Sequence, residues 1–400
     1  MGRAGVVARR AFAGVSGLLR RRRAPGQVGE VVPTPGDLRA PGASLLPRDR
    51  LTAALALVAQ AERLEPALPS VEDPVDFWGR DRVARRPEVP EAVSALLPPQ
   101  QRRGWSVDSP QVVVLSAPVA ADLVVTAKFD IRAGVKLRAA YAERGLTLAT
   151  HPRGSNGVDG IARCVRAHQV VSVHAPGLVP PLVGQGQLGP DQPYLVERWL
   201  DGTPLLTGTR LAAAAPEIID GLARVHRGHG VEHLPVSEHW AVLPQRWSDT
   251  VATGIVPADL GAWVSGLLQR NATIRRSWVH GDLVASNVLR TATGVTLIDW
   301  EHSQHAPIMN DGAKLHLFSR DPAGTLVHVL EGFGDVARGS GAPGPAGAYS
   351  PAEELALAHA NLLARYPRRS AALVGHPRAE VYEKQVRRQV ERLAQVRAAA

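Results

Sequence analysis

Short apolar runs separated by polar or glycine-containing turns fill the second quarter of the chain. Runs of this kind, rich in Val, Leu and Thr, predict β-strands. The predicted strands are 111–115, 122–129, 135–142, 146–150, 178–186 and 193–200. Between the fourth and fifth strands, residues 160–174 carry apolar residues at helical spacing. This order of strands and helix predicts a small α+β lobe that ends near Leu200.

After residue 200 the apolar residues recur mainly at i, i+3 and i+4, which predicts helices. These helices are expected at 216–228, 259–270, 311–318, 351–366 and 380–396. An Ala/Leu-rich stretch at 51–64 predicts an earlier helix, and the glycine-rich segment 339–351 predicts a loop or lid. The predicted domains are a basic, disordered tail at 1–50, a helical or irregular extension at 51–110, a small lobe at 111–200 and a helical lobe at 201–400.

The positive charge of the chain is concentrated at its N-terminal end. The 400 residues have a formal net charge of +9, and residues 1–50 contain ten Arg and three acidic residues, which leaves +2 for the remainder. This distribution argues against nucleic acid as the partner of the whole chain. Apolar residues along one face of 5–23, beside four consecutive arginines, favour contact with an anionic membrane surface. A solvated tail is the alternative interpretation.

Hydropathy and cysteine content narrow the class of protein further. No run of about 18 uncharged apolar residues is present, so no membrane-spanning helix is predicted. The single Cys164 excludes an intrachain disulfide and a multi-cysteine metal site, and a buried, unreactive role is expected for it. We expect a cytoplasmic protein, with peripheral membrane attachment through the tail as an alternative.

Polar residues interrupt an apolar pattern in the stretch WVHGDLVASNVLRTATGVTLIDWEHS. The stretch predicts a loop followed by a β-hairpin with Thr293 and Gly294 in its turn. Phosphoryl transfer needs a carboxylate that orients the acceptor hydroxyl, and an amide oxygen and a second carboxylate that hold Mg²⁺. Asp282 suits the first role, and Asn287 and Asp299 suit the second. Turn capping is the alternative role for these side chains.

The segments HGDLVASNVL and LIDWE resemble the catalytic loop and metal-binding segment of the aminoglycoside phosphotransferase and choline kinase families, which have the protein-kinase-like fold. The resemblance spans roughly residues 111–365. It implies a bilobal α+β fold, ATP or GTP as co-substrate, Mg²⁺, and a small hydroxylated acceptor. It also implies Asp282 as catalytic base and Asn287 and Asp299 as metal ligands.

The same resemblance implies roles for residues outside this trio. His280 would support the catalytic loop, and Asp311 would steady it by accepting hydrogen bonds from its backbone. The segment PYLVERWL resembles the last strand of the small lobe and the hinge after it. Backbone groups near Glu197 to Trp199 would then meet the nucleotide base.

The phosphate-binding lysine of these families, with its helix glutamate, has two alternative positions in this sequence. Lysine is scarce, with four against 42 Arg, so Lys128 on a predicted strand is one candidate, with Glu143 as its partner. In the other register the hairpin is 135–154. That register places Thr150, His151 or Arg153 at the lysine position and His168 or Arg166 at the glutamate position.

Two further patterns have structural interpretations. Gly184, Gly186 and Gly189 satisfy G-x-G-x-x-G, but a strand comes after them instead of a helix, so a turn between strands is favoured over a pyrophosphate site. Six of the eight Trp lie between Trp199 and Trp300. Core packing is favoured for them, with an aromatic cage for a quaternary ammonium as the alternative.

The sequence therefore predicts a Mg²⁺-dependent kinase that moves the γ-phosphate of ATP or GTP to a hydroxyl of a small molecule. The acceptor is expected among aminoglycosides, sugars and amino alcohols. The alternative is a catalytically weak, pseudokinase-like binding module, attached to a membrane through its tail.

Overall fold

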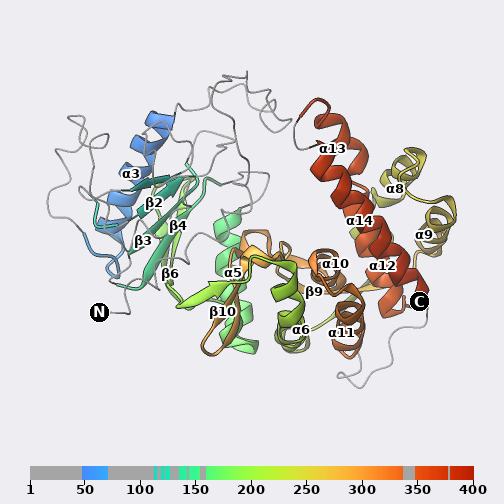
Figure 1. The fold of residues 1–400 in the computed structure, drawn as a ribbon. Helices are drawn as coiled ribbons and strands as arrows, with labels where there is room; N and C mark the ends of the chain where they lie inside the picture. The colour runs from blue at the N-terminus through green and yellow to red at the C-terminus, as the bar shows by residue number, and fades with distance from the viewer. Residues whose placement is uncertain are drawn as a thin grey trace.

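The computed structural model has an antiparallel sheet at one side and a mainly helical region at the other (Figure 1). It describes residues 47–70, 112–114, 119–121, 123–126, 135–141, 144–153, 159–336, 347–376 and 379–400. The N-terminal tail, most of the predicted extension, Lys128 and Glu143 lie outside these ranges. Within them, every helix is too short or too polar to cross a bilayer.

Six antiparallel strands form the sheet of the small lobe. They are β1 (Val112–Val114), β2 (Leu123–Thr126), β3 (Leu137–Tyr141), β4 (Leu146–Thr150), β5 (Leu182–Gln187) and β6 (Pro193–Arg198). Their order is β1-β2-β3-β4-β6-β5, so the chain leaves β4, passes through helix α5 (Gly160–His174), and returns by way of the edge strand β5. The predicted strand 146–150 and helix 160–174 coincide with β4 and α5, and the other predicted strands differ only at their ends.

Helix α3 (Pro47–Leu64) covers one face of this sheet, and α5 covers the other. Leu55 and Val58 of α3 are buried with Leu137 and Ala139 of β3 in one hydrophobic core. The α3 residue Glu62 is also buried, and it accepts hydrogen bonds from two backbone N–H groups and from a tyrosine hydroxyl of β3. Residues that alternate along β3 must therefore point toward opposite sides, with the intervening Arg138 on the side of α5.

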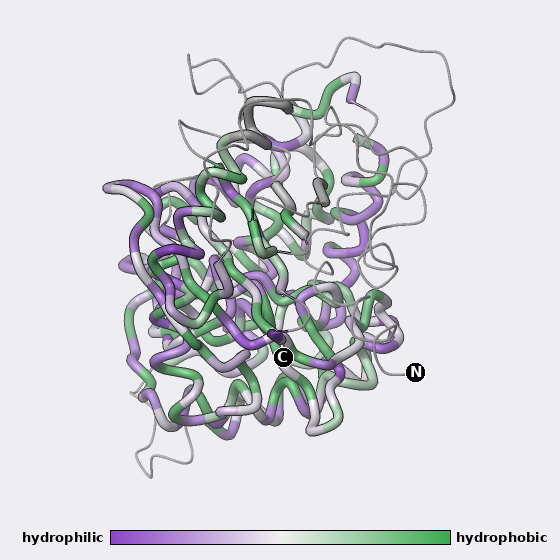
Figure 2. The backbone as a smooth tube through the Cα atoms, turned by 90° about the vertical axis from the view of Figure 1, so that its left-hand side faces the viewer, coloured by the Kyte–Doolittle hydropathy of each residue, from purple (hydrophilic) through white to green (hydrophobic). Residues whose placement is uncertain are grey.

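Nine helices of four or more residues come after β6 in the described part of the chain. They are α6 (Gly208–His229), α7 (Val236–His239), α8 (Leu243–Ala252), α9 (Ala258–Arg270), α10 (Met309–Phe318), α11 (Pro322–Gly334), α12 (Pro351–Leu363), α13 (Tyr366–Ala372) and α14 (Ala379–Ala398). Their apolar faces form a second core, to which α5 also contributes. Figure 2 shows hydrophobic and hydrophilic stretches alternating along these helices, as expected for helices with one face in a core.

Three predicted helix boundaries were wrong by three or more residues, and one of them is the start of the helix predicted at 51–64, which lies at Pro47. The helix predicted at 216–228 begins at Gly208, because Thr207 caps it by accepting a hydrogen bond from Arg210 N, and Pro216 lies inside it. The helix predicted at 351–366 ends at Leu363, and a separate short helix, α13, comes next. Helices α7, α8 and α11 were not predicted.

Two three-stranded sheets complete the large lobe. One joins β7 (Gly202–Pro204), β10 (Val288–Thr291) and β11 (Gly294–Leu297), and the other joins β8 (Glu232–Pro235), β9 (Thr273–Val279) and β12 (Gln304–Pro307). The predicted hairpin is β10–β11, but its turn was misplaced. Gly294 pairs with Thr291 as the first residue of β11, so Ala292 and Thr293 form the turn.

Candidate active site

The loop after β9 begins with a backbone conformation that requires glycine. Gly281 has φ +79°, and a Cβ atom at this position would lie 2.3 Å from the carbonyl oxygen of His302. A side chain would therefore clash with backbone as well as strain the left-handed conformation. Gly281 therefore lets the chain turn away from the direction of β9, so that Asp282 is directed toward the neighbouring segments.

Asp311, at the start of α10, holds this loop through its backbone. Its carboxylate accepts hydrogen bonds from His280 N at 2.7 Å and from Gly281 N at 2.9 Å. The side chain is fully buried, and burial raises the pKa of the Asp311 carboxyl while the two backbone N–H groups oppose that rise. Both bonds link residues about 30 positions apart, so they tie the loop to the helix.

His280 is buried and its hydrogen bonds define its tautomer. Its Nδ1 accepts from Asp282 N at 3.2 Å, so the ring proton must lie on Nε2, which donates to the carbonyl of Ile298 at 3.0 Å. Burial lowers the pKa of this imidazole, in agreement with a neutral ring. The ring also packs on Trp300, with centroids 4.5 Å apart. His280 therefore connects the Asp282 loop with the segment after β11.

Asp282 is partly exposed and is paired with a lysine of α10. Lys314 Nζ donates to Asp282 Oδ1 at 2.6 Å and to the carbonyl of Gly281 at 2.7 Å. Burial opposes ionisation of Asp282, but the charge and hydrogen bond of Lys314 outweigh it and hold the pKa of the carboxyl below its ordinary value. Such a carboxylate accepts a hydrogen bond from a hydroxyl well but is a weak base.

Asn287 and Asp299 approach the same region from the two ends of the β10–β11 hairpin. Asn287 is buried, and its Nδ2 donates to the backbone carbonyl of Asp282 at 2.9 Å, with Asp282 Oδ2 at 3.5 Å. Asp299 has φ +69°, a strained conformation for a residue with a side chain. Strain of this kind is found mainly where surrounding contacts hold a functional side chain in place.

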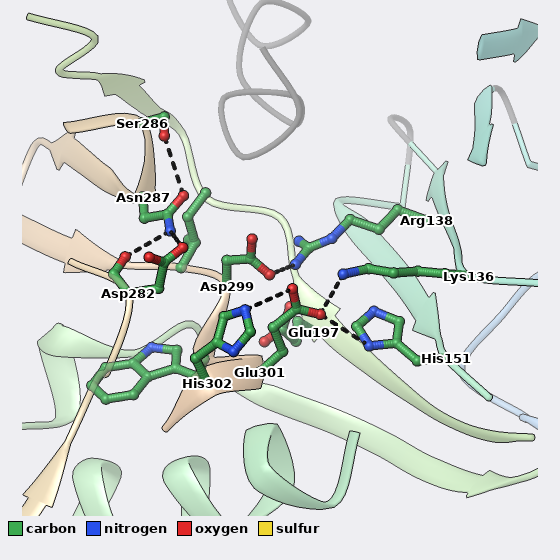
Figure 3. Close-up of polar contacts among 12 residues, drawn as sticks. Lys136, Arg138, His151, Glu197, Asp282, Ser286, Asn287, Asp299, Glu301 and His302 are labelled. Carbon is green, nitrogen blue, oxygen red and sulfur yellow. Dashed lines mark hydrogen bonds and ion pairs between the residues drawn. The ribbon is translucent and has the colours of Figure 1, made fainter. Parts of the chain in front are cut away.

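Cations from the small lobe meet the carboxylates of this segment (Figure 3). Arg138 Nη2 of β3 lies 2.8 Å from Asp299 Oδ1, and Lys136, just before β3, pairs with Glu301. His151 Nδ1 lies 3.2 Å from Glu301, and burial together with the charges of Lys136 and Arg138 holds the pKa of His151 well below its ordinary value. A row of cationic and polar side chains therefore connects the sheet with the end of the hairpin.

The side chains at the alternative lysine and glutamate positions contact other residues. Thr150 Oγ1 donates to the Pro193 carbonyl at 2.7 Å and so links β4 to β6. Arg153 and Arg166 are directed to Asp159 and Gln169 in exposed contacts. Only His151, of the three candidates at the lysine position, reaches the hairpin segment, through Glu301.

Glu197 and Trp199 already have partners within the small lobe. Glu197 Oε1 lies 2.8 Å from His168 Nε2 of α5, a pairing between the last strand and the helix. Trp199 N donates to the Gly145 carbonyl at 2.8 Å. The contact of this segment with a nucleotide base stays a prediction.

Only Gly189 of the glycine motif lies in the predicted turn between strands, because the other two glycines are inside a strand. Gly184 and Gly186 are part of β5, and Cβ atoms there would lie 2.2 Å from Glu65 and 2.6 Å from Tyr194. Close packing of these two side chains explains both glycines. Cys164 is buried, and its pKa is raised well above the ordinary value by burial, which agrees with an unreactive role.

Core packing is also the role of most of the clustered tryptophans. Trp240, Trp247, Trp278 and Trp300 are buried in the large core, and Trp263 packs against it.

Sequence reasoning missed four charged residues of this site: Lys136, Arg138, Glu301 and Lys314. The scarcity of lysine was a usable signal, because two of the four lysines of the chain lie here, but it was applied only to Lys128. Glu301 stood within the LIDWE motif and was passed over. Arg138 carried no signal, since 41 other arginines surround it in the sequence.

The oxygen ligands of this site suit a hard cation. Asn287 supplies an amide oxygen and Asp299 a carboxylate, and Mg²⁺ prefers carboxylate, carbonyl and water oxygens. The described residues include no group of three or more His, Cys, Asp and Glu side chains placed to hold a metal ion by themselves. An ion held by one amide oxygen and one carboxylate would have to keep several waters and share phosphate oxygens with a substrate, as Mg²⁺ can do.

Comparison with known families identifies the group of proteins to which the site belongs. Residues 147–346, half of the chain, match the model of the phosphotransferase enzyme family. The chain belongs to this family. The match begins in β4 and includes Asp282, Asn287 and Asp299, while Lys136 and Arg138 precede it.

Solved structures show a distant likeness. One is an aminoglycoside phosphotransferase from Alicyclobacillus acidocaldarius, with 18% identity, 66% of this chain and 87% of that chain covered, and a TM-score of 0.40. Another is the choline kinase LicA from Streptococcus pneumoniae, with 16% identity, coverage of 71% and 95%, and a TM-score of 0.43. A third is a choline/ethanolamine kinase family protein from Mesorhizobium loti, with 15% identity, coverage of 66% and 84%, and a TM-score of 0.43. A search of curated protein sequences finds no match.

The predicted family resemblance and the predicted α+β class are confirmed. The chain has antiparallel sheets, many helices and the family's own sequence pattern. Its activity is that of a phosphotransferase family, and the nucleotide, metal and acceptor remain to be assigned from the site.

Proposed function

We propose that the protein transfers the γ-phosphoryl group of ATP or GTP to a hydroxyl group of a small molecule. The strongest support is the hydrogen bond from Asn287 Nδ2 to the Asp282 carbonyl. Asp299 lies beside both residues in a strained backbone conformation. Asp311 holds the same loop through its backbone, and His280 links the loop to the segment after β11. Supporting contacts that fix the positions of polar side chains are typical of a catalytic site.

In the proposed reaction Asp282 accepts a hydrogen bond from the acceptor hydroxyl and aligns its oxygen with the γ-phosphorus. A bond forms between that oxygen and phosphorus, the bond from phosphorus to the bridging oxygen breaks, and the nucleoside diphosphate leaves with the electron pair. The low pKa of Asp282 means that it orients the hydroxyl first. It takes the proton only as the new bond forms and the oxygen becomes acidic.

Asn287 and Asp299 are the proposed ligands of Mg²⁺, which when bound neutralises negative charge on the phosphate oxygens. Asn287 Nδ2 is held by the Asp282 carbonyl, and its Oδ1, which accepts a hydrogen bond from Ser286 Oγ at 3.4 Å, is the atom that would face a metal. The positions of these two side chains therefore depend on the same short loop as the base.

Arg138 and Lys136 are the proposed contacts for the nucleotide phosphates. Arg138 of β3 stands directly opposite Ala149 of β4 in the sheet register, so the small alanine side chain leaves room for the guanidinium on that face. In this proposal the Arg138 guanidinium has the phosphate-binding role of a strand lysine. Its fork can contact two phosphate oxygens at once, unlike a lysine ammonium.

A pseudokinase-like binding module is the second candidate, and one observation favours it. Asp299 and Glu301 are each paired with a cation of the small lobe. A metal ion would have to displace Arg138 or share Asp299 with it. If the pair persists in solution, nucleotide binding would be weak and independent of Mg²⁺.

A thermal-shift titration distinguishes the two candidates, because a ligand that binds the native state raises the melting temperature. ATP and GTP are each titrated with and without Mg²⁺ against the wild type, Asp299→Asn and Asp282→Asn. The proposal expects a Mg²⁺-dependent shift that Asp299→Asn loses and Asp282→Asn keeps, with turnover lost in both variants. A wild type that shows no shift with either nucleotide would support the binding module.

A further inference from the structure

A pocket with a volume of about 180 Å³ opens beside Asp282. Its walls come from the catalytic loop and from α10, α12, α13 and α14. Asp282 is part of the pocket lining, so a hydroxyl bound in the pocket can reach the Asp282 carboxylate. The pocket is therefore the natural place for the acceptor, an assignment that rests on the proposed function.

The volume of the pocket limits the size of the acceptor. Pockets that enclose drug-sized ligands have volumes of about 300–1,000 Å³. A pocket of about 180 Å³ has room for one sugar ring or a molecule of similar size. A multi-ring aminoglycoside would leave most of its surface outside.

The charge of the pocket is the more informative property. Its lining contains three cations, Lys314, Arg365 and Arg369, and one carboxylate, Asp282, which gives a net charge of +2. Lys314 already neutralises Asp282 at 2.6 Å. The charges that remain for a ligand are therefore the two guanidinium groups.

Those two arginines lie one helical turn apart, and Asp282, the carboxylate that lines the pocket with them, is paired with Lys314. Arg369 N donates to the Arg365 carbonyl at 3.0 Å, which places both side chains on one side of α13. In the part of the chain that the structure describes, neither guanidinium forms an ion pair with a carboxylate. Partial burial and the charge of Arg369 lower the pKa of Arg365, the effect expected of neighbouring like charges.

Aromatic contacts hold one of these arginines in position. Arg369 lies over the ring of Tyr382, with its Cζ 5.7 Å from the centroid, and Tyr382 stacks on Tyr366 of α13. The contact with the Tyr382 ring restricts the guanidinium of this otherwise exposed side chain, which reduces the entropy that a ligand contact would cost.

We infer that the acceptor is a small polyol that carries a carboxylate or phosphate group, held by Arg365 and Arg369 while one of its hydroxyls meets Asp282. An anionic group would accept charge-assisted hydrogen bonds from both guanidinium groups. A polycationic aminoglycoside or a quaternary ammonium would instead face the two remaining guanidinium groups. Of the described lining residues, Phe318 and Tyr382 are aromatic, and the Tyr382 ring is already covered by Arg369. Val284, Leu317 and Leu362 form an apolar wall against which one face of a sugar ring can pack.

Four sugars with one ring and different charge test this inference. Glucose, glucosamine, glucuronate and glucose 6-phosphate are titrated calorimetrically into the wild type and into the double variant Arg365→Gln, Arg369→Gln. Arg368→Gln is the matched control, because Arg368 is exposed on the same helix and does not line the pocket. The two anionic sugars also distinguish a carboxylate site from a phosphate site.

The expected result is that at least one anionic sugar binds the wild type about tenfold or more tightly than glucose and glucosamine. The double variant should lose that preference, and the control should keep it. Equal or tighter binding of glucose or glucosamine, or no preference among the four, would overturn the inference. Failure of the proposed function has a different signature, namely no Mg²⁺-dependent nucleotide shift in a protein that still prefers the anionic sugar.

Discussion

Arg138 Nη2 lies 2.8 Å from Asp299 Oδ1, although 161 residues separate them in the chain. The pKa of Arg138 is raised, because the charges of Asp299 and Glu197 outweigh the cost of burying the guanidinium. The pair joins the sheet of the small lobe to the end of the β10–β11 hairpin. A cation in this place can hold the two lobes together without a ligand and contact nucleotide phosphates when one is bound.

Replacement of Arg138 tests the second of these roles. Arg138→Leu should weaken Mg²⁺-nucleotide binding by roughly 10- to 100-fold, since a hydrogen bond to a charged group is worth about 1.5–3 kcal/mol. Arg138→Lys should restore part of it. Titration calorimetry measures both, with Arg144→Leu in the exposed β3–β4 turn as the control. Tighter nucleotide binding in Arg138→Leu would mean that Arg138 blocks the site.

Lys314 should determine how far the pH can fall before activity is lost. Asp282 must be ionised to accept the acceptor hydrogen bond, and Lys314 holds its pKa below the ordinary value of 3.8. In Lys314→Met, burial would dominate and raise the pKa of Asp282, so the acid limb of kcat should move to higher pH. Activity measured at about pH 5 relative to about pH 7.5 should fall in Lys314→Met. It should stay unchanged in Lys384→Met, whose lysine is exposed on α14.

An acid limb that stays in place after Lys314→Met would remove Lys314 from the control of Asp282. The ratio of the two rates is used because Lys314 also lines the acceptor pocket. A loss of acceptor affinity lowers activity at both pH values and leaves the ratio unchanged.

The loop and hairpin of the candidate site could be predicted from the sequence because their residues are close together along the chain. Asp282, Asn287 and Asp299 fall within 18 residues, so one loop and one hairpin carry all three. The strand and helix patterns of the small lobe were also readable, down to the ends of β4 and α5.

The cations of the site could not be predicted, because their contacts depend on strand register and on packing between lobes. Arg138 reaches Asp299, and Lys136 reaches Glu301 across 165 positions. A periodic pattern shows that β3 is a strand but does not show which segment its polar side meets. The same limit applies to Glu62, whose hydroxyl partner on β3 lies 79 residues away.

Gly281 offers a test of the loop geometry that involves no charged group. Gly281→Ala should cost roughly 1–3 kcal/mol from the left-handed backbone alone, and the 2.3 Å approach to the His302 carbonyl adds to it. Displacement of the loop should also abolish turnover. Denaturant unfolding measures the first effect, with Gly266→Ala as the control. Gly266 lies in α9 with open space around it, so its alanine variant should be more stable by about 0.5–1 kcal/mol. Normal activity in Gly281→Ala would show that the loop tolerates another course.

His226 of α6 should make the stability of the fold sensitive to acid. Burial and the charge of Arg275 lower its pKa from 6.5 to about 3, and the side chain packs on Phe333 at 5.3 Å between centroids. Between these pH values the unfolded chain binds a proton that the folded chain does not, so stability is lost as the pH falls from 6.5 toward 3. The loss between pH 7 and pH 5 is about 2 kcal/mol from this residue.

Substitution of His226 by a residue that does not titrate isolates that contribution. His226→Met should be less stable than the wild type at pH 7, because the new side chain must repack against Phe333. Its free energy of unfolding should nevertheless fall by about 2 kcal/mol less than that of the wild type between pH 7 and pH 5. Urea unfolding at the two pH values gives the difference, with His328→Gln on the exposed side of α11 as the control. Equal pH dependence in His226→Met and wild type would mean that His226 is protonated as readily in the folded chain as in the unfolded one, so that the acid sensitivity must come from the other buried histidines.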